Sequence, residues 1–255
     1  MLKKTKMRLV IKVGTSLIAP GGRIDLQRMR ALVDQIDISH HECLIVTSGA
    51  IASGMSNLGL SERPTAVPLM QACAAVGQSL LMHTYERLFF GKKVVAQLLL
   101  SSDDFTSPVR YKNLQNALSE LLKMGVVPIV NENDSVSVRE LVGAFGDNDE
   151  LSALLATAVQ ADWLLLLTDV DGFYISKGNQ QKIVRTVRKF TPDLEALCNG
   201  TGKLGTGGMR SKIRAAKTAS EAGVHVAIVN GRHERAISSA VERKIGTYFP
   251  PSENE

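Results

Sequence analysis

Cysteine, aromatic residues and long apolar runs are all scarce in this sequence of 255 residues, and each scarcity excludes a class of protein. The three cysteines, Cys43, Cys73 and Cys198, lie far apart without metal-binding or redox spacing, so we expect ordinary burial in a reducing compartment. No segment reaches 18 apolar residues without a charge, and Lys12 interrupts the first apolar run. These features predict no membrane span and no signal peptide, and hence a cytoplasmic protein.

The charged residues and the histidines exclude two further classes. Lys and Arg exceed Asp and Glu by 30 to 25, which gives a net charge of +5, but the basic residues are scattered and aromatics make up only 5%. We therefore expect no nucleic-acid partner and a surface biased toward small anionic ligands. The five histidines, at 40, 41, 83, 225 and 233, show no metal-binding spacing, so no metal held by protein ligands is expected.

Apolar runs of strand length alternate with helical patterns along the chain. We predict strands at 9–13, 43–47, 94–100, 126–130, 163–167 and 224–229. Helices are predicted at 26–36, 68–90, 114–122, 151–159 and 194–198, and after the glycine-rich loop 200–208. The strand runs are almost continuously apolar, which indicates a mainly parallel sheet covered by helices on both faces. A turn signal at Asp171 and Gly172 predicts a hairpin of 173–175 with 183–187.

Two glycine-rich segments that contain lysine, one toward each end of the chain, predict phosphate binding. The first is Lys-Val-Gly-Thr-Ser at 12–16, directly after the apolar run 9–11, and the second is 205–212, which opens a helix and ends at Lys212. Glycines let backbone amides approach an anion, the start of a helix attracts it, and a lysine adds a full charge. An ordinary turn and a surface loop are the alternatives for these two segments.

Polar segments after other strands complete the candidate site. Three consecutive Asp and Asn residues at 147–149 exceed what one helix cap needs, so the surplus can bind an ammonium group or hold lysines in place. Asn-Glu-Asn-Asp at 131–134 is either a polar loop or a place for a positively charged substrate group. Ser-Gly-Ala at 48–50 either serves close helix packing or offers amides to a carboxylate, and Thr-Asp at 168–169 is either a turn or a nucleotide contact. Ligands of parallel sheets lie beyond the carboxyl ends of the strands, where all these segments are expected to meet.

Taken together, these segments resemble the glutamate 5-kinases, a family of the amino-acid kinase superfamily. The resemblance rests on 12–16, 46–50, 131–134, 146–149, 167–169 and 205–212, in that order, and covers nearly the whole chain. It implies a three-layer α/β/α open sandwich with an acceptor lobe at about 1–160 and a nucleotide lobe at about 161–255. Many family members carry a C-terminal PUA module, for which this sequence has no room, so we expect a single kinase domain.

The resemblance also implies a reaction and a set of residues. The reaction transfers the γ-phosphoryl group of ATP, carried with Mg²⁺, to the side-chain carboxylate of L-glutamate. A carboxylate with a pKa of about 4.3 is already ionised at neutral pH and needs no general base, in agreement with the absence of histidine from these segments. The implied catalytic residues are Lys12, Lys212 and Asp149, with Asp149 orienting both lysines. The implied substrate-binding residues are Ser48, Gly49, Ala50, Asp134, Asp147 and Asn148. The implied nucleotide-binding residues are Lys12, Gly14, Thr15, Ser16, Thr168, Asp169, Thr206, Gly207, Gly208, Met209, Arg210, Ser211 and Lys212.

Two alternatives stay open at this point. The chain can be another kinase of the superfamily, acting on acetylglutamate, aspartate or a nucleoside monophosphate. It can also be an amino-acid sensor on the same fold that binds glutamate without consuming ATP. In every case we expect a homo-oligomer.

Overall fold

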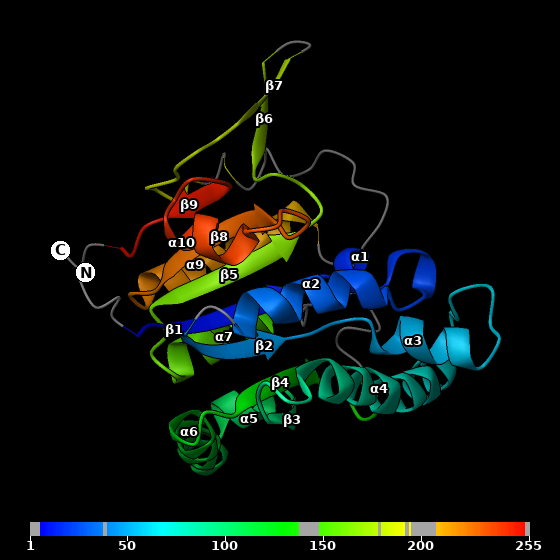
Figure 1. Cartoon of the computed structure of the whole chain (residues 1–255). Coiled ribbons are helices and arrows are strands. Elements are labelled where there is room, and N and C mark those ends of the chain that lie inside the picture. Colours follow the sequence, from blue (N-terminus) through cyan, green and yellow to red (C-terminus); the bar gives the residue numbers. More distant parts are fainter. Residues whose placement is uncertain are drawn as a thin grey trace.

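The computed structural model describes residues 6–37, 40–137, 148–177, 180–191, 194 and 208–252. Its centre is a seven-stranded sheet with the order β3-β4-β2-β1-β5-β8-β9 (Figure 1). The strands are β1 (Arg8–Val13), β2 (Glu42–Val46), β3 (Val95–Leu100), β4 (Val127–Glu132), β5 (Trp163–Thr168), β8 (His225–Asn230) and β9 (Thr247–Phe249). Only the edge strand β9 runs antiparallel to its neighbour, which confirms the prediction of a mainly parallel sheet.

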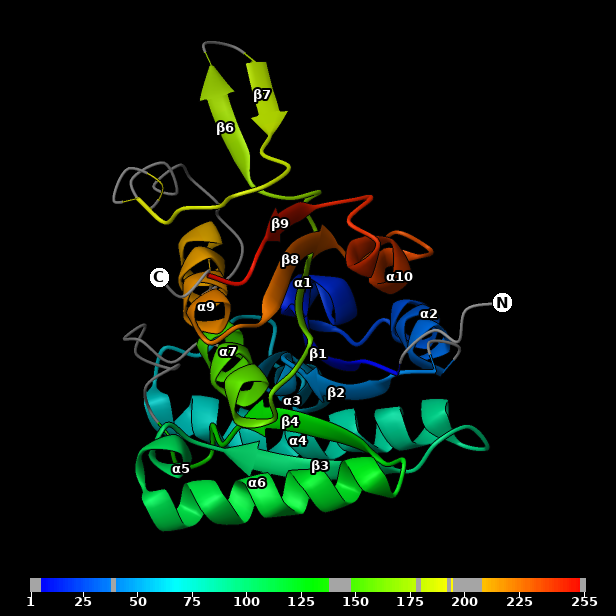
Figure 2. The same cartoon turned by 90° about the vertical axis from the view of Figure 1, so that its left-hand side faces the viewer.

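Helices cover both faces of the sheet and give the molecule three layers (Figure 2). One face packs against α2 (Leu26–Asp37), α4 (Val67–Phe89) and α10 (Ala236–Val241). The other face packs against α6 (Pro108–Lys123), α7 (Asn148–Ala158) and α9 (Met209–Glu221). Shorter elements are α1 (Thr15–Ile18), the 3₁₀ turn η1 (Pro20–Gly22), α3 (Ala50–Asn57) and α5 (Asp103–Thr106). None of the described helices combines the length and apolar character needed to cross a membrane.

The central strand β1 shows how the sheet divides the core. Leu9, Ile11 and Val13 pack in the cluster that contains α2, α4 and α10, whereas Val10 packs in the cluster that contains α6, α7 and α9. Side chains alternate between the two faces along a strand. Lys12 therefore shares the face of Val10 and is directed toward α7 and α9, although its neighbours in the strand are apolar.

The six sheet strands and the main helices predicted from periodicity are confirmed, with shifts of a few residues at their ends. The predicted hairpin is partly wrong. Its strands are β6 (Tyr174–Lys177) and β7 (Gln180–Ile183), which pair antiparallel and project beyond the β9 edge of the sheet (Figure 1). After Ile183 the backbone amide of Val184 still donates to the carbonyl oxygen of Phe173 at 2.8 Å, whereas Thr186 forms a bridge with Tyr248. The polar β7 escaped prediction because a ladder is made by the backbone and needs no apolar pattern. The predicted helix 194–198 and loop 200–208 lie outside the described residues, apart from Leu194 and Gly208.

Candidate active site

The predicted site segments meet at one edge of the sheet. Lys12 lies near the end of β1, Ser48 follows β2, Asn131 lies near the end of β4, and Thr168 closes β5. These four strands are parallel neighbours, so their carboxyl ends lie at the same edge. The edge is where open α/β sheets bind ligands.

Two lysines that are 200 positions apart in the sequence meet on one buried carboxylate. Lys12 Nζ lies 2.7 Å from Oδ1 of Asp149, and Lys212 Nζ lies 3.0 Å from Oδ2 of the same side chain. The side chains of the two lysines are 5% and 9% exposed, and that of Asp149 is fully buried. Lys12 comes from β1, Asp149 from the first turn of α7, and Lys212 from the first turn of α9. The structure thus brings together all three predicted catalytic residues.

The charges of this cluster explain the protonation state of Asp149. Burial by itself raises the pKa of a carboxyl group, but the ammonium groups of Lys12 and Lys212 and the hydroxyl of Ser211 together hold the pKa of Asp149 well below its usual range. Asp149 is therefore ionised. Two ammonium groups held at one point suit a phosphate ligand at the sheet edge.

Ser211, predicted to bind nucleotide, contacts the central carboxylate. Its hydroxyl donates to Oδ2 of Asp149 at 2.6 Å and is 2.9 Å from the carbonyl oxygen of Gly208. In this state the Ser211 side chain helps to fix Asp149 and the start of α9. Of the three residues before it, Gly208 at the helix cap and Arg210 in α9 are exposed, and Met209 in α9 is half-buried. Thr206 and Gly207, predicted to bind nucleotide, lie outside the described residues.

The acidic segment begins its helix earlier than predicted. We expected a helix from about 151, but α7 starts at Asn148, so Asn148 and Asp149 lie inside its first turn. Carboxylates in the first turn interact favourably with the helix dipole, which the prediction did not consider. Asn148 is 1% exposed and its Nδ2 donates to Oγ of Ser48 at 3.3 Å. Asp147 lies outside the described residues.

The predicted acceptor residues surround this contact. Ser48 and Ala50 are buried, and Gly49, with a φ of 93°, makes the left-handed turn from which α3 starts. A side chain at position 49 would be strained there, which explains the glycine. Asp134 is 6% exposed and lies in the turn after β4. The segments 48–50 and 131–134 follow the adjacent strands β2 and β4, so they are neighbours.

The remaining predicted nucleotide residues lie at the ends of β1 and β5. The amide of Gly14 donates to the carbonyl oxygen of Leu167 at 3.3 Å, which ties the turn after β1 to β5. Thr15 and Ser16 open α1, with Thr15 exposed and Ser16 half-buried. Thr168 is buried and its hydroxyl donates to the exposed Asp169 at 3.3 Å. These residues share the sheet edge with the lysine pair.

A buried amide pair at the same edge was not predicted. Nδ2 of Asn131 donates to Oε1 of Gln78 at 2.9 Å, and both side chains are buried. Gln78 was overlooked because a single polar residue inside the apolar helix α4 gives no motif.

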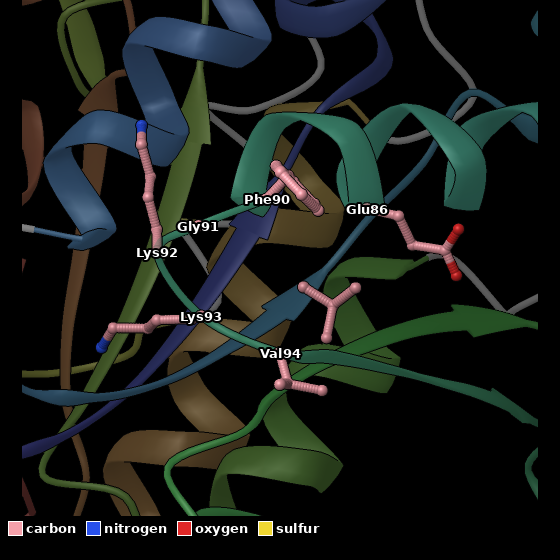
Figure 3. Close-up of a pocket in the computed structure, with 7 residues that line it drawn as sticks. Glu86, Phe90, Gly91, Lys92, Lys93 and Val94 are labelled. Atoms are coloured by element: carbon pink, nitrogen blue, oxygen red, sulfur yellow. The ribbon is translucent and has the colours of Figure 1, made fainter.

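The hollow shown in Figure 3 lies away from the predicted site residues. It has a volume of about 440 Å³ and lies where α4 ends and β3 begins, lined by residues that include Glu86, Phe90 and Val94. The start of β3 belongs to the amino edge of the sheet, opposite the lysine pair. Figure 3 shows Glu86 and the lysines at 92 and 93 extending in different directions. The hollow contains none of the predicted site residues.

The described residues were also assessed for metal binding. Within the ranges that the structure describes, no group of three or more His, Cys, Asp and Glu side chains is close enough to hold a metal ion. Asp149, the central carboxylate, has its two oxygens on two lysines.

Fold and site together define an α/β sandwich with two lysines that contact one buried carboxylate at the carboxyl edge of its sheet. Comparison with known proteins gives the family: the model of the amino acid kinase family matches residues 7–230. The chain belongs to the amino acid kinase family. The glutamate 5-kinase of Caldanaerobacter subterraneus is 45% identical over 97% of this chain and 69% of its own length. That of Clostridium acetobutylicum is 44% identical over 96% of this chain and 94% of its own length. That of Listeria monocytogenes is 42% identical over 99% of this chain and 96% of its own length.

Solved structures agree on the fold. Carbamate kinase of Giardia superposes with a TM-score of 0.65 at 17% identity, covering 98% of this chain and 100% of that protein. An isopentenyl phosphate kinase superposes with a TM-score of 0.65 at 16% identity, covering 95% of this chain and 99% of that protein. UMP kinase of Ureaplasma parvum gives 0.59 at 15% identity, covering 96% and 99%. At such identities the likeness establishes the shared α/β/α fold alone.

Proposed function

We propose that this chain transfers the γ-phosphoryl group of ATP to the side-chain carboxylate of L-glutamate, giving L-glutamyl 5-phosphate and ADP in the first step of proline biosynthesis. The relatives named glutamate 5-kinase, 42 to 45% identical over nearly the whole chain, support the substrate. The observation that carries the reaction type is the convergence of Lys12 and Lys212 on Asp149. Two cations fixed at one point suit a polyphosphate ligand.

The two lysines stabilise the charge that is transferred. A carboxylate oxygen of glutamate forms the new bond to the γ-phosphorus while the bond to the bridging oxygen of ADP breaks, and the charge is spread over the phosphoryl oxygens. Lys12 and Lys212 donate hydrogen bonds to these oxygens. Asp149 limits the rotamers of both lysines, so little reorganisation is needed when charge develops.

The acceptor lies on the other side of Asp149, in this proposal. Ser48 follows β2, Asp134 follows β4, and Asn148 starts α7, where its side chain contacts Ser48. Their oxygen atoms suit the ammonium group of an amino acid, and the amides of residues 49 and 50 suit a carboxylate. Asp147 belongs to the same proposed set. An N-acylated amino acid lacks the ammonium group, so this set favours free glutamate over acetylglutamate.

Nucleotide binding is assigned to the opposite half of the sheet edge. The proposed contacts are Gly14, Thr15 and Ser16 after β1, Thr168 and Asp169 at the end of β5, and residues 206–212 before and in α9. In this division, residues to about 160 form the acceptor lobe and the rest form the nucleotide lobe. Mg²⁺ would come bound to ATP and would neutralise part of the phosphate charge. Asp149 is not assigned to the ion, because its two oxygens contact the two lysines. The homo-oligomer and the cytoplasmic location stay predictions.

The test is incubation with Mg-ATP and a panel of acceptors in the presence of hydroxylamine, which traps an acyl phosphate as a hydroxamate. Glutamate is expected to give hydroxamate and ADP in equal amounts, whereas N-acetylglutamate, aspartate and UMP are expected to give neither hydroxamate nor ADP above background. Product from N-acetylglutamate or aspartate but not from glutamate would reassign the substrate. ADP formed only with UMP would reassign the chain to nucleotide kinases. Glutamate binding without any ADP release would favour the amino-acid sensor.

A further inference from the structure

One buried hydrogen-bond donor beside the acceptor residues has no hydrogen-bond acceptor among the described residues. Gln78, in the middle of α4, is 8% exposed, and within the described ranges its Nε2 atom has no hydrogen-bond acceptor. A buried amide nitrogen without a partner costs stability. Such an atom inside a binding site is retained when a ligand completes its hydrogen bonds.

The orientation of this amide is fixed by its neighbours. Oδ1 of Asn131 accepts from the backbone amide of Glu132 at 3.0 Å, so Nδ2 of Asn131 is the atom that faces Gln78. That nitrogen needs an acceptor, which identifies the near atom of Gln78 as Oε1, at 2.9 Å. The far atom of Gln78 is therefore the donor Nε2. Exchanging the two atoms would set two N–H groups against each other.

The position of Gln78 places this donor among the acceptor segments. Val46 pairs with Val130, and the amide of Thr47 donates to the carbonyl oxygen of Val130, so Asn131 emerges beside the segment that leads to Ser48. Gly77, the residue before Gln78 in α4, lies against the segment 47–50. A Cβ atom built on Gly77 would lie 1.7 Å from the carbonyl oxygen of Ala50. Gln78 thus lies between the segments 47–50 and 131–134.

A second buried atom at this edge has the opposite polarity. Oδ1 of Asn148 has no hydrogen-bond donor within the described ranges, while Nδ2 of the same side chain donates to Ser48. Among the described residues the edge therefore offers an unsatisfied donor, on Gln78, and an unsatisfied acceptor, on Asn148. A zwitterionic amino acid carries the matching groups, a carboxylate to accept and an ammonium group to donate.

We propose that Gln78 is an acceptor-binding residue whose Nε2 donates a hydrogen bond to a carboxylate oxygen of the bound amino acid. Asn131 is a positioning residue that turns the amide of Gln78 so that this nitrogen faces the ligand. The inference rests on the proposed function for the identity of the amino acid. A purely structural role for Gln78 would affect folding without affecting the affinity for the acceptor.

The variant Gln78→Glu tests the proposal, because it keeps an oxygen for Asn131 and replaces only the donor atom with an oxygen. A lost hydrogen bond to a charged group corresponds to about a 10- to 100-fold rise in the KM for glutamate. The KM for ATP is expected to change by less than about twofold, because the substitution removes a contact to the acceptor and leaves the nucleotide contacts intact. Gln78→Met, whose side chain has similar length and no charge, is expected to raise the KM for glutamate and to leave the KM for ATP unchanged. This variant tests the proposal if Gln78→Glu does not fold. Gln71→Glu, two helical turns earlier on α4, is the matched control and is expected to behave like the wild type.

A second readout is the rise in the melting temperature caused by glutamate in the absence of ATP. The proposal expects this rise in the wild type and in Gln71→Glu, and its loss in both Gln78 variants at the same glutamate concentration. Folded Gln78 variants with a wild-type KM for glutamate and a wild-type thermal response would overturn the proposal. A wild type that makes no hydroxamate from glutamate refutes the proposed function instead, and the thermal response to glutamate still reports on Gln78.

Discussion

Removing the charge of Asp149 is the most informative single change in this site. In Asp149→Asn the ammonium groups of Lys12 and Lys212, on side chains that are 5% and 9% exposed, would lose the carboxylate that both of them contact. Removing one partner of a buried ion pair costs about 3–5 kcal/mol, because the remaining charge stays buried without compensation. The lysines would also turn away from the sheet edge, so we expect the rate of glutamate phosphorylation to fall by about 10² to 10³.

Urea unfolding and the hydroxamate assay measure these two losses. The matched control is Glu120→Gln, which breaks a pair with Lys123 whose side chains are both 66% exposed. An exposed pair contributes less than about 1 kcal/mol, so the control is expected to keep stability and activity. Equal unfolding midpoints for Asp149→Asn and the wild type would refute the argument that this carboxylate compensates two buried cations.

Three further predictions concern the same site. Lys212→Ala is expected to stay folded, with Asp149 still paired to Lys12, and its rate is expected to fall by about 10² to 10³. Lys217→Ala, which changes a side chain of the same helix that is 47% exposed, is the control and is expected to keep its rate. Near-normal turnover by Lys212→Ala would contradict the role of Lys212. Although burial favours protonation, the lysines hold the pKa of Asp149 below its ordinary 3.8, so its contribution to stability is present above that pH and lost as the pH falls further. The difference in unfolding free energy between the wild type and Asp149→Asn should thus be constant from about pH 5 to 7 and shrink below about pH 4, and a difference that grows with acid contradicts the assignment. Gly77→Ala would place a Cβ atom 1.7 Å from the carbonyl oxygen of Ala50, so we expect a loss of about 1–3 kcal/mol in urea unfolding and a higher KM for glutamate; wild-type values would show that α3 and α4 separate freely.

Most of the fold follows from the sequence because the sheet is covered on both faces. Buried parallel strands leave continuous apolar runs, such as the one that became β5, and amphipathic helices leave a clear period, as in α2. β7 is polar and β9 is short, so neither strand has an apolar period to detect. Both are defined by backbone pairing, β7 with β6 and β9 with β8.

The candidate site was predictable where charge stands out against its surroundings. Lys12 interrupts an apolar strand, and Asp149 lies in a run of Asp and Asn that exceeds the need of one cap. The exact partners were not predictable from local sequence, because Ser211 and Asn148 each find theirs more than 60 positions away. Gln78 left no motif at all, and its significance comes only from the hydrogen bonds of Asn131.

The crystal structure of the protein with glutamate and a non-hydrolysable ATP analogue would test the central claim most directly. The account predicts the γ-phosphate between the ammonium groups of Lys12 and Lys212, with the glutamate side-chain carboxylate on the far side of that phosphate from ADP. A nucleotide whose phosphates lie away from either lysine would contradict the account.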